Sequence, residues 1–168
     1  MENAKKTQDR LYHIRILRTY LEYIKNNRND IDINQLLDYA GISRSEVDDD
    51  GFWYTQEQSD RFHEILNKLT GKRNIAREVG RYGASSASLG TIRQYVFSML
   101  NPSMAYALLG KIGSKLTKGT NISIKSLSSN SVEAVYTLNS GVEEKPYQCQ
   151  NRYGFMEAVA IPFTGEFA

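Results

Sequence analysis

Apolar residues recur at helical spacing through the first 116 residues, and they change to strict alternation after that point. Spacings of three and four residues predict amphipathic helices that each bury one face. Asp32, Ser43 and Thr55 stand where N-caps are expected, and Gln58 follows Thr55 at the spacing of a capping box. The predicted helices span residues 10–26, 33–39, 55–69, 75–82, 89–100 and 103–116, with one further turn at 43–47.

Alternating apolar and polar residues at 120–127 and 132–138 flank the short polar turn Ser128-Ser129-Asn130, a pattern typical of a β-hairpin. A last helix is predicted at 149–161, where Pro162 stops it. Helices followed by strands indicate the α+β class. We therefore expect an N-terminal helical bundle packed on a small antiparallel sheet, with a C-terminal closing helix.

The length of 168 residues suits one domain, with a helical part at 10–116 and the hairpin and closing helix at 120–163. A lone hairpin is marginally stable and leaves two strand edges open. Either further strands follow Ala168 or a partner subunit completes the sheet. We prefer the first, a piece of a longer protein, and we also expect self-association as a homodimer.

The composition excludes several classes of protein. A share of 40% hydrophobic residues is typical of a globular chain, and a net charge of +2 is too small to indicate nucleic-acid binding. One cysteine, Cys149, rules out a disulfide framework, and a buried small residue is preferred there over a reactive thiol. The polar N-terminus shows no signal peptide, and no apolar run reaches about 18 residues. A cytoplasmic domain without membrane insertion is expected.

Catalytic and metal-binding motifs are missing from the sequence. The two histidines, His13 and His63, have no metal-site spacing, and His63 lies next to the apolar face of its helix. Neither a Gly-x-Ser-x-Gly elbow nor a phosphate-binding loop occurs. We expect no catalytic residue, no metal and no cofactor in this chain.

Two segments carry weaker hints of anion binding. Residues 32–47 imitate a helix-turn-helix, but the three carboxylates of Asp48, Asp49 and Asp50 follow at once and would repel phosphate. A run of three arginines spaced four apart shares one helix face, where a solvated face is preferred over an anion site: Arg73, Arg77 and Arg81. DNA binding through residues 32–47 stays open as a rival function.

A ligand site is predicted where the helices of residues 89–116 face the hairpin and the closing helix. Tyrosine and methionine are frequent there; tyrosine adds a polar tip to an apolar body, and methionine adapts to irregular shapes. Filling of the core is the simpler interpretation for any one of these residues. The facing set is Tyr95, Met99, Tyr106, Phe155 and Met156. A small apolar or aromatic molecule would suit such a pocket.

Four segments resemble a known family. They are LLDYAGISRSEVDDDGFWYTQEQSDRFHEIL, NIAREVGRYGASSASLG, NPSMAYALLGKI and EKPYQCQNRYGFMEAVAIPF. Together they resemble the N-terminal sensory domain of bacterial sensor histidine kinases. A more distant resemblance is to 4-vinyl reductase-type, haem nitric-oxide-binding-like and arabinose-regulator-type ligand-binding domains.

This resemblance implies an α+β module that binds a small molecule and is covalently attached to an output domain in a two-component signal-transduction protein. The chain departs from the haem-binding relatives, because it has no Tyr-x-Ser-x-Arg motif and no histidine between Arg81 and Ala168. It also ends before the closing Cys…Gly-Gly…Cys segment of the family. The alternatives are part of a transcriptional regulator and a structural dimerisation module.

Overall fold

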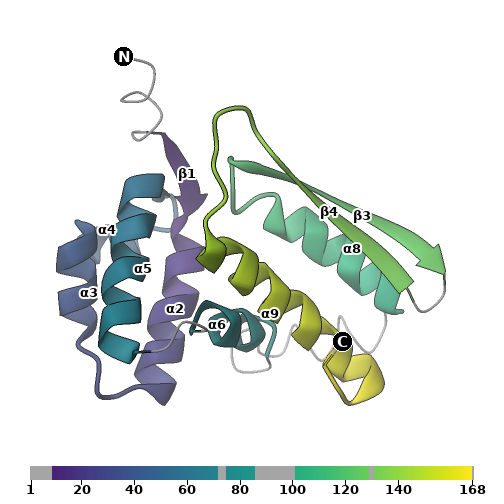
Figure 1. The fold of residues 1–168 in the computed structure, drawn as a ribbon, viewed down its shortest axis with the longest axis horizontal. Coiled ribbons are helices and arrows are strands. Elements are labelled where there is room, and N and C mark those ends of the chain that lie inside the picture. Colours follow the sequence, from purple (N-terminus) through teal and green to yellow (C-terminus); the bar gives the residue numbers. More distant parts are fainter. Residues whose placement is uncertain (1–8, 72–74, 86–100, 129–130, 168) are drawn as a thin grey trace.

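The computed structural model describes residues 9–71, 75–85, 101–128 and 131–167. It has the expected α+β class, with helices, two small antiparallel sheets and a long C-terminal helix (Figure 1). The predicted helix at 89–100 lies outside the described residues. The elements are β1 (Arg10–His13), α2 (Ile14–Asn27), α3 (Ile33–Ala40), α4 (Arg44–Asp48), β2 (Trp53–Thr55), α5 (Gln56–Thr70), α6 (Ile75–Gly83), α8 (Pro102–Gly113), β3 (Thr120–Ser128), β4 (Ser131–Leu138) and α9 (Pro146–Thr164).

The N-terminal boundary corrects the sequence prediction, because residues 10–13 form strand β1 rather than the first turn of a helix. β1 pairs antiparallel with β2, and the Ile14 amide donates to the Phe52 carbonyl at 3.0 Å. His13 then caps α2, since its Nδ1 accepts from the Arg15 amide at 3.2 Å. The aromatic residues Trp53 and Tyr54 therefore belong to strand β2, whose pairing partner lies about forty residues away and could not be found from local periodicity.

The helical half is built around one large core, to which β1 and helices α2 to α6 contribute. The predicted N-caps Asp32, Ser43 and Thr55 are all confirmed, and so is the capping box of Thr55 with Gln58. Ser43 also forms a capping box with Glu46, which was not predicted. α3 and α5 end at glycines that adopt left-handed backbone conformations, which is typical of helix C-caps. The largest side chains with almost no exposure include Tyr20, Tyr54, Phe62, Leu36 and Leu66.

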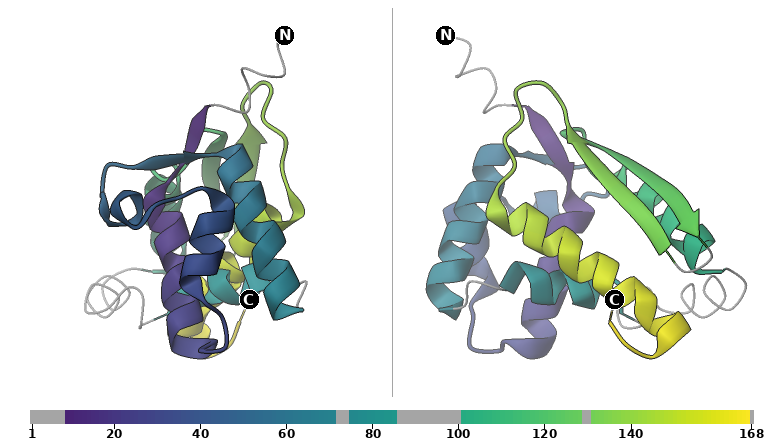
Figure 2. Two further views of the ribbon diagram at one scale, coloured as in Figure 1. Left: turned by 90° about the vertical axis from the view of Figure 1, so that its left-hand side faces the viewer. Right: turned by 45° about the vertical axis from the view of Figure 1, so that its right-hand side comes forward.

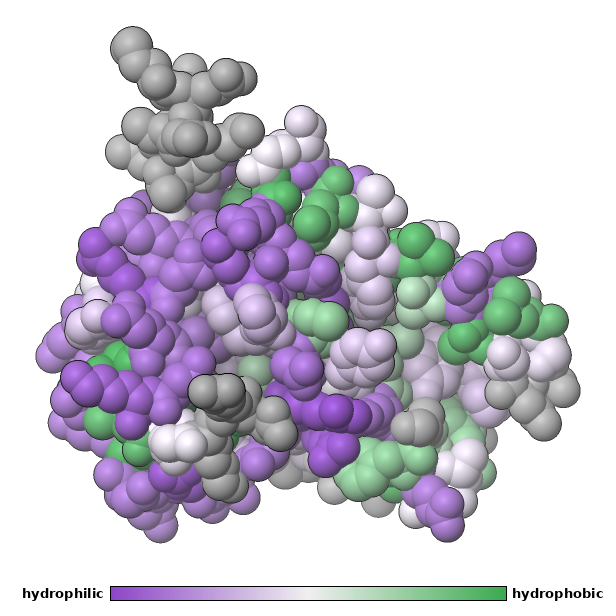
Figure 3. All heavy atoms as spheres, viewed as in Figure 1, coloured by the Kyte–Doolittle hydropathy of each residue, from purple (hydrophilic) through white to green (hydrophobic). Residues whose placement is uncertain are grey.

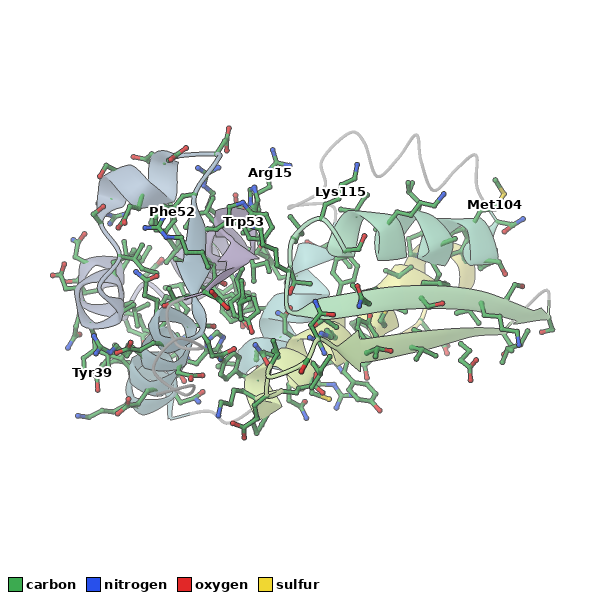
Figure 4. The ribbon with its side chains drawn as sticks, turned by 90° about the horizontal axis from the view of Figure 1, so that it is seen from above. Arg15, Tyr39, Phe52, Trp53, Met104 and Lys115 are labelled. Carbon is green, nitrogen blue, oxygen red and sulfur yellow. The ribbon has the colours of Figure 1, made fainter. Side chains whose placement is uncertain are left out.

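The hairpin is confirmed, with Ile122 opposite Tyr136 and Ile124 opposite Ala134. α8 covers its inner face so closely that a Cβ on Gly110 would lie 2.6 Å from Ile124 Cγ1. Met104 lies on the other side of α8, pointing away from the strands (Figure 4). The core of this half is small, and its buried members are Ala84, Ala105, Tyr106, Ala158 and Val159.

α9 is longer than predicted at both ends. Pro146 occupies the first turn, where a missing amide costs nothing, and Pro162 lies inside the helix near its end. A proline so close to the C-terminus removes one backbone hydrogen bond, and the helix ends soon after at Gly165, which has a left-handed backbone. None of the helices that the structure describes is both long enough and apolar enough to cross a membrane.

The two halves join along α6 and α9, which cross in the middle of the molecule (Figure 2). A Cβ on Gly80 would lie 2.0 Å from the Asn151 carbonyl oxygen, and one on Gly154 would lie 2.0 Å from that of Arg77. The helix backbones therefore touch at two glycines. A second junction runs beside β1, where the His13 amide donates to the Leu116 carbonyl at 2.9 Å and the Lys118 amide donates to Leu11 at 2.8 Å.

Candidate functional site

A cavity of about 190 Å³ lies at the junction of the two halves. Its walls are mostly apolar, and residues from both halves form them. We call it the tyrosine-lined cavity, because tyrosines from β1, α2, β2, β4 and α9 reach it: Tyr12, Tyr20, Tyr54, Tyr136 and Tyr147. The apolar side chains Ile16, Leu116, Ile122 and Phe155 fill the spaces between them.

Hydrogen bonds tie the start of α9 to β1 and α5 at one side of the cavity. Gln148 Nε2 donates to the Tyr12 hydroxyl at 2.6 Å, and that hydroxyl donates to Gln56 Oε1. Gln56 Nε2 donates in turn to the Tyr147 hydroxyl and to Asp60 Oδ1, both at 2.8 Å. The Tyr147 hydroxyl donates to Asp60 Oδ1 at 2.7 Å. This connected network fixes the rotamers of two cavity tyrosines.

His63 differs from its polar neighbours in the wall of the cavity. It is 5% exposed, and its Nδ1 lies 2.8 Å from the Ser59 carbonyl oxygen, one helical turn earlier on α5. Its ring stacks on Tyr147 with centroids 3.6 Å apart, and Tyr20 approaches edge-on at 4.9 Å. Nε2 is buried and has no hydrogen-bond partner among the described residues. Burial without compensating charge lowers the pKa of His63 to about 4.

The tyrosine hydroxyls around the cavity are neutral near pH 7, and the one charged side chain that lines it is paired within the protein. Burial raises the pKa of Tyr12, Tyr20, Tyr54 and Tyr147, so their hydroxyls keep their protons. Arg152 is the one basic side chain among the lining residues, and it pairs with Glu144 while its guanidinium lies 4.8 Å from the Tyr136 ring centroid. A neutral, mostly apolar molecule suits these walls better than an ion does.

The structure separates the residues that the sequence grouped as a ligand site. Phe155 lines the tyrosine-lined cavity. Tyr106 and Met156 lie together instead beside an open groove between β4 and α9, where the Tyr106 hydroxyl donates to the Met156 carbonyl at 2.9 Å. Tyr95 and Met99 lie outside the described residues. Phe155 is thus the predicted member that meets the cavity found in the structure.

Sequence reasoning missed most of the cavity wall. The predicted first helix includes Tyr12, and the predicted last helix begins only after Tyr147 and Gln148, so neither the network nor the stacked histidine was expected. The available signal was general: 11 tyrosines against one tryptophan, and a histidine beside an apolar helix face. Such counts indicate a residue type suited to pockets, but they do not say which tyrosines converge.

The arginine face of α6 is not the solvated face that the sequence favoured. Arg77 and Arg81 both bind Glu157 of α9, and the Arg81 guanidinium lies 2.9 Å from its carboxylate. The first arginine of the run, Arg73, lies outside the described residues. The two arginines therefore hold α6 against α9.

The segment at 32–47 that imitates a helix-turn-helix forms helix α3 and the short helix α4. α4 is a single turn of five residues, and the Arg44 guanidinium donates two hydrogen bonds, of 2.9 and 3.1 Å, to Asn34 Oδ1 of α3.

Figure 3 shows that hydrophilic residues dominate the surface of the N-terminal helices, while hydrophobic ones are more frequent over the hairpin half. Among the described residues, no cluster of three or more His, Cys, Asp or Glu side chains is placed to hold a metal ion.

Comparisons with protein-family models, with curated proteins and with solved structures find no match to this chain. The functional interpretation therefore depends on the geometry of the cavity and on the residue resemblance described above.

Proposed function

We propose that this chain is a sensory domain that binds a small, largely apolar molecule in the tyrosine-lined cavity. The observation that carries the proposal is the cavity of about 190 Å³, with mostly apolar walls and a few fixed polar groups. An apolar cavity of about 150 Å³ is large enough to bind benzene, so this one suits a molecule of one or two rings. A few oriented polar groups in an apolar wall are typical of small-molecule sites.

The position of the cavity supports a sensing role. Tyr20 and His63 belong to the N-terminal helices, whereas Ile122 and Tyr136 belong to the hairpin. A ligand between them would contact both halves and favour one relative placement of the hairpin and α9 over others. A ligand can shift a conformational equilibrium only by its difference in affinity for the two states, and a site between two units provides such a difference.

The proposal extends, on the residue resemblance, to the sensory part of a cytoplasmic bacterial signal-transduction protein of the sensor histidine kinase type. In that setting an output domain is covalently attached and the protein works as a homodimer. The function of the chain itself is recognition, with no catalytic step and no cofactor. The hydrogen-bond network of Tyr12 and Gln148 supports this role, because it holds α9 at the edge of the cavity.

A thermal-shift screen tests the proposal. The probes are benzene, toluene, phenol, indene and indole, each titrated to its solubility limit. A molecule that binds only the folded state at about 100 times its Kd adds about 2.7 kcal/mol. For a domain of this size we therefore expect the Tm to rise by about 5–10 °C.

A matched pair of variants locates the binding site. Ile122→Trp puts an indole into the cavity from the hairpin, and it should remove the shift in Tm. Val135→Trp places the same group on the outer face of the hairpin, where Val135 is 45% exposed, and it should keep the shift. The proposal is wrong if no probe raises the Tm of the unaltered chain, or if both variants bind the probe as the unaltered chain does.

A further inference from the structure

Almost every polar group around the tyrosine-lined cavity already has a partner within the protein. The Tyr12 and Tyr147 hydroxyls belong to the network at the start of α9. Gln148 Oε1 accepts from the Lys145 amide at 2.8 Å, and Asn151 Nδ2 donates to the Ala76 carbonyl at 3.2 Å. These groups position the wall, and they have little capacity left for a ligand.

Among the fully buried side-chain polar atoms of the described residues that line the cavity, His63 Nε2 is the one without a hydrogen-bond partner. Its tautomer follows from the other ring nitrogen: a carbonyl oxygen can only accept, so Nδ1, at 2.8 Å from the Ser59 carbonyl, carries the proton. Nε2 then presents a free lone pair. Because Nδ1 is held against the backbone of α5, the opposite edge of the ring points away from that helix.

The surroundings of His63 favour an acceptor over other roles. Tyr147, Tyr20 and Phe62 surround the ring, and its hydrogen bond goes to the Ser59 backbone rather than to the Ser59 hydroxyl, so there is no serine–histidine nucleophile pair. A buried imidazole that resists protonation is a weak general base. Lone buried acceptors are rare in folded proteins, and a hydrogen-bond donor from outside the chain would satisfy this one.

We infer that the molecule bound in the tyrosine-lined cavity is a small aromatic compound with one N–H or O–H group, and that His63 Nε2 accepts that hydrogen. This inference rests on the proposed function and adds the chemical class of the ligand. Aromatic walls accommodate a ring in edge-to-face contacts, as Tyr20 already makes with His63 at an interplanar angle of 85°. The single donor orients the ring, and His63 discriminates against compounds of equal size and shape that lack the N–H or O–H group.

Two pairs of probes separate shape from hydrogen bonding. Indole and indene differ by an N–H in place of a CH2, and phenol and toluene differ by an O–H in place of a CH3. Sites that hydrogen-bond a ligand discriminate strongly against analogues that lack the group. We expect calorimetric titration to give a Kd at least ten-fold lower for the donor-bearing member of at least one pair.

His63→Phe tests the acceptor directly, because it keeps an aromatic ring and removes the lone pair. The variant should lose the preference, so that each pair binds within about two-fold. A second measurement does not need the variant: in protein labelled with 15N-histidine, the donor-bearing probe should shift the Nε2 resonance of His63 and leave that of His13 unchanged. His13 lies on β1 and does not line the cavity.

The outcomes separate this inference from the proposed function. If both members of each pair bind equally to the unaltered chain, the cavity binds ligands but the role of His63 is wrong. The inference is also wrong if indole keeps its advantage in His63→Phe, or if the Nε2 resonance does not move on binding. If neither these four probes nor benzene binds, the proposed function fails together with it.

Discussion

The two halves of this molecule bury their hydrophobic residues to very different extents. The N-terminal half encloses large side chains completely, with Ile14, Leu36 and Phe62 each 0% exposed. In the hairpin half, Met104 and Leu127 are more than half exposed, and the buried core consists mainly of alanine and valine. Fully buried large side chains contribute about 1.5–3 kcal/mol each, so the first half has far more stability of its own.

This difference explains the position of the cavity. The hairpin and α8 are held to the N-terminal half by the crossing of α6 with α9 and by the pairing of residues 116–118 with β1. Two units that are joined at their edges do not interdigitate fully between those joints. Single cores reach the density of organic crystals, but a boundary between two cores can retain space. The ligand site that we propose is this retained space.

Gly154→Ala should have the largest effect on stability, because it disrupts the contact that joins the two halves. Its Cβ would lie 2.0 Å from the Arg77 carbonyl oxygen, so α9 has to move away from α6. We expect a loss of more than about 3 kcal/mol in the free energy of unfolding, although alanine is the better helix former by about 1 kcal/mol. Urea denaturation followed by circular dichroism measures it.

Gly51→Ala is the control for that variant. A Cβ on Gly51 would lie 3.4 Å from Asp49 Oδ1, which is an ordinary contact, so stability should change by less than about 0.5 kcal/mol. If Gly154→Ala were as stable as this control, the close contact of α6 and α9 would not hold the halves together.

Lowering the pH should weaken the N-terminal half through His63. The pKa of His63 is lowered from 6.5 to about 4 in the folded protein, because burial disfavours the charged ring. Between these two values the unfolded chain binds a proton that the folded chain does not, so stability falls as the pH falls through this window. The slope reaches about 1.4 kcal/mol per pH unit, and the total is about 3 kcal/mol.

His63→Phe should flatten the stability profile between pH 6.5 and 4, whereas His13→Gln should leave it steep. The groups around His63 are the uncharged Tyr20, Phe62 and Tyr147, with Asp60 behind Tyr147. Urea midpoints measured across this range give the slopes. Equal slopes in the unaltered chain and in His63→Phe would show that His63 is protonated as easily in the folded state as in the unfolded state.

Glu157→Gln should have the smallest effect, since it weakens the α6–α9 junction without breaking the glycine contact. Hydrogen bonds from Arg77 lower the pKa of the Glu157 carboxyl. Its contribution is therefore present above the ordinary pKa of about 4.5 and is lost as the pH falls through the lowered value. We expect a loss of about 1–2 kcal/mol at pH 7, because the carboxylate is 13% exposed and has two arginine partners.

Glu143→Gln is the matched control for Glu157→Gln. Glu143 is 80% exposed and pairs with Lys145, so its removal should cost less than about 0.5 kcal/mol. Urea midpoints at pH 7 compare the two variants. Equal losses would mean that the Arg77–Glu157–Arg81 contact contributes no more to stability than a surface pair does.

Local pattern was sufficient for much of the fold. The helices α3 and α5, their caps at Asp32 and Thr55, and the β3–β4 hairpin follow from periodicity and capping chemistry, because these signals depend on residues within a few positions of one another. The α+β class follows from the order of such segments. Phe155 was also predicted as a site residue and does line the cavity.

The cavity itself depended on contacts between residues far apart in the chain. Tyr12 meets Gln148 across 136 positions, and His63 stacks on Tyr147 from another element. β1 exists because β2 pairs with it, and no local signal distinguishes its four residues from a first helical turn. Periodicity tells which face of an element is buried but not what it is buried against, so the convergence of five tyrosines and a histidine required the folded chain.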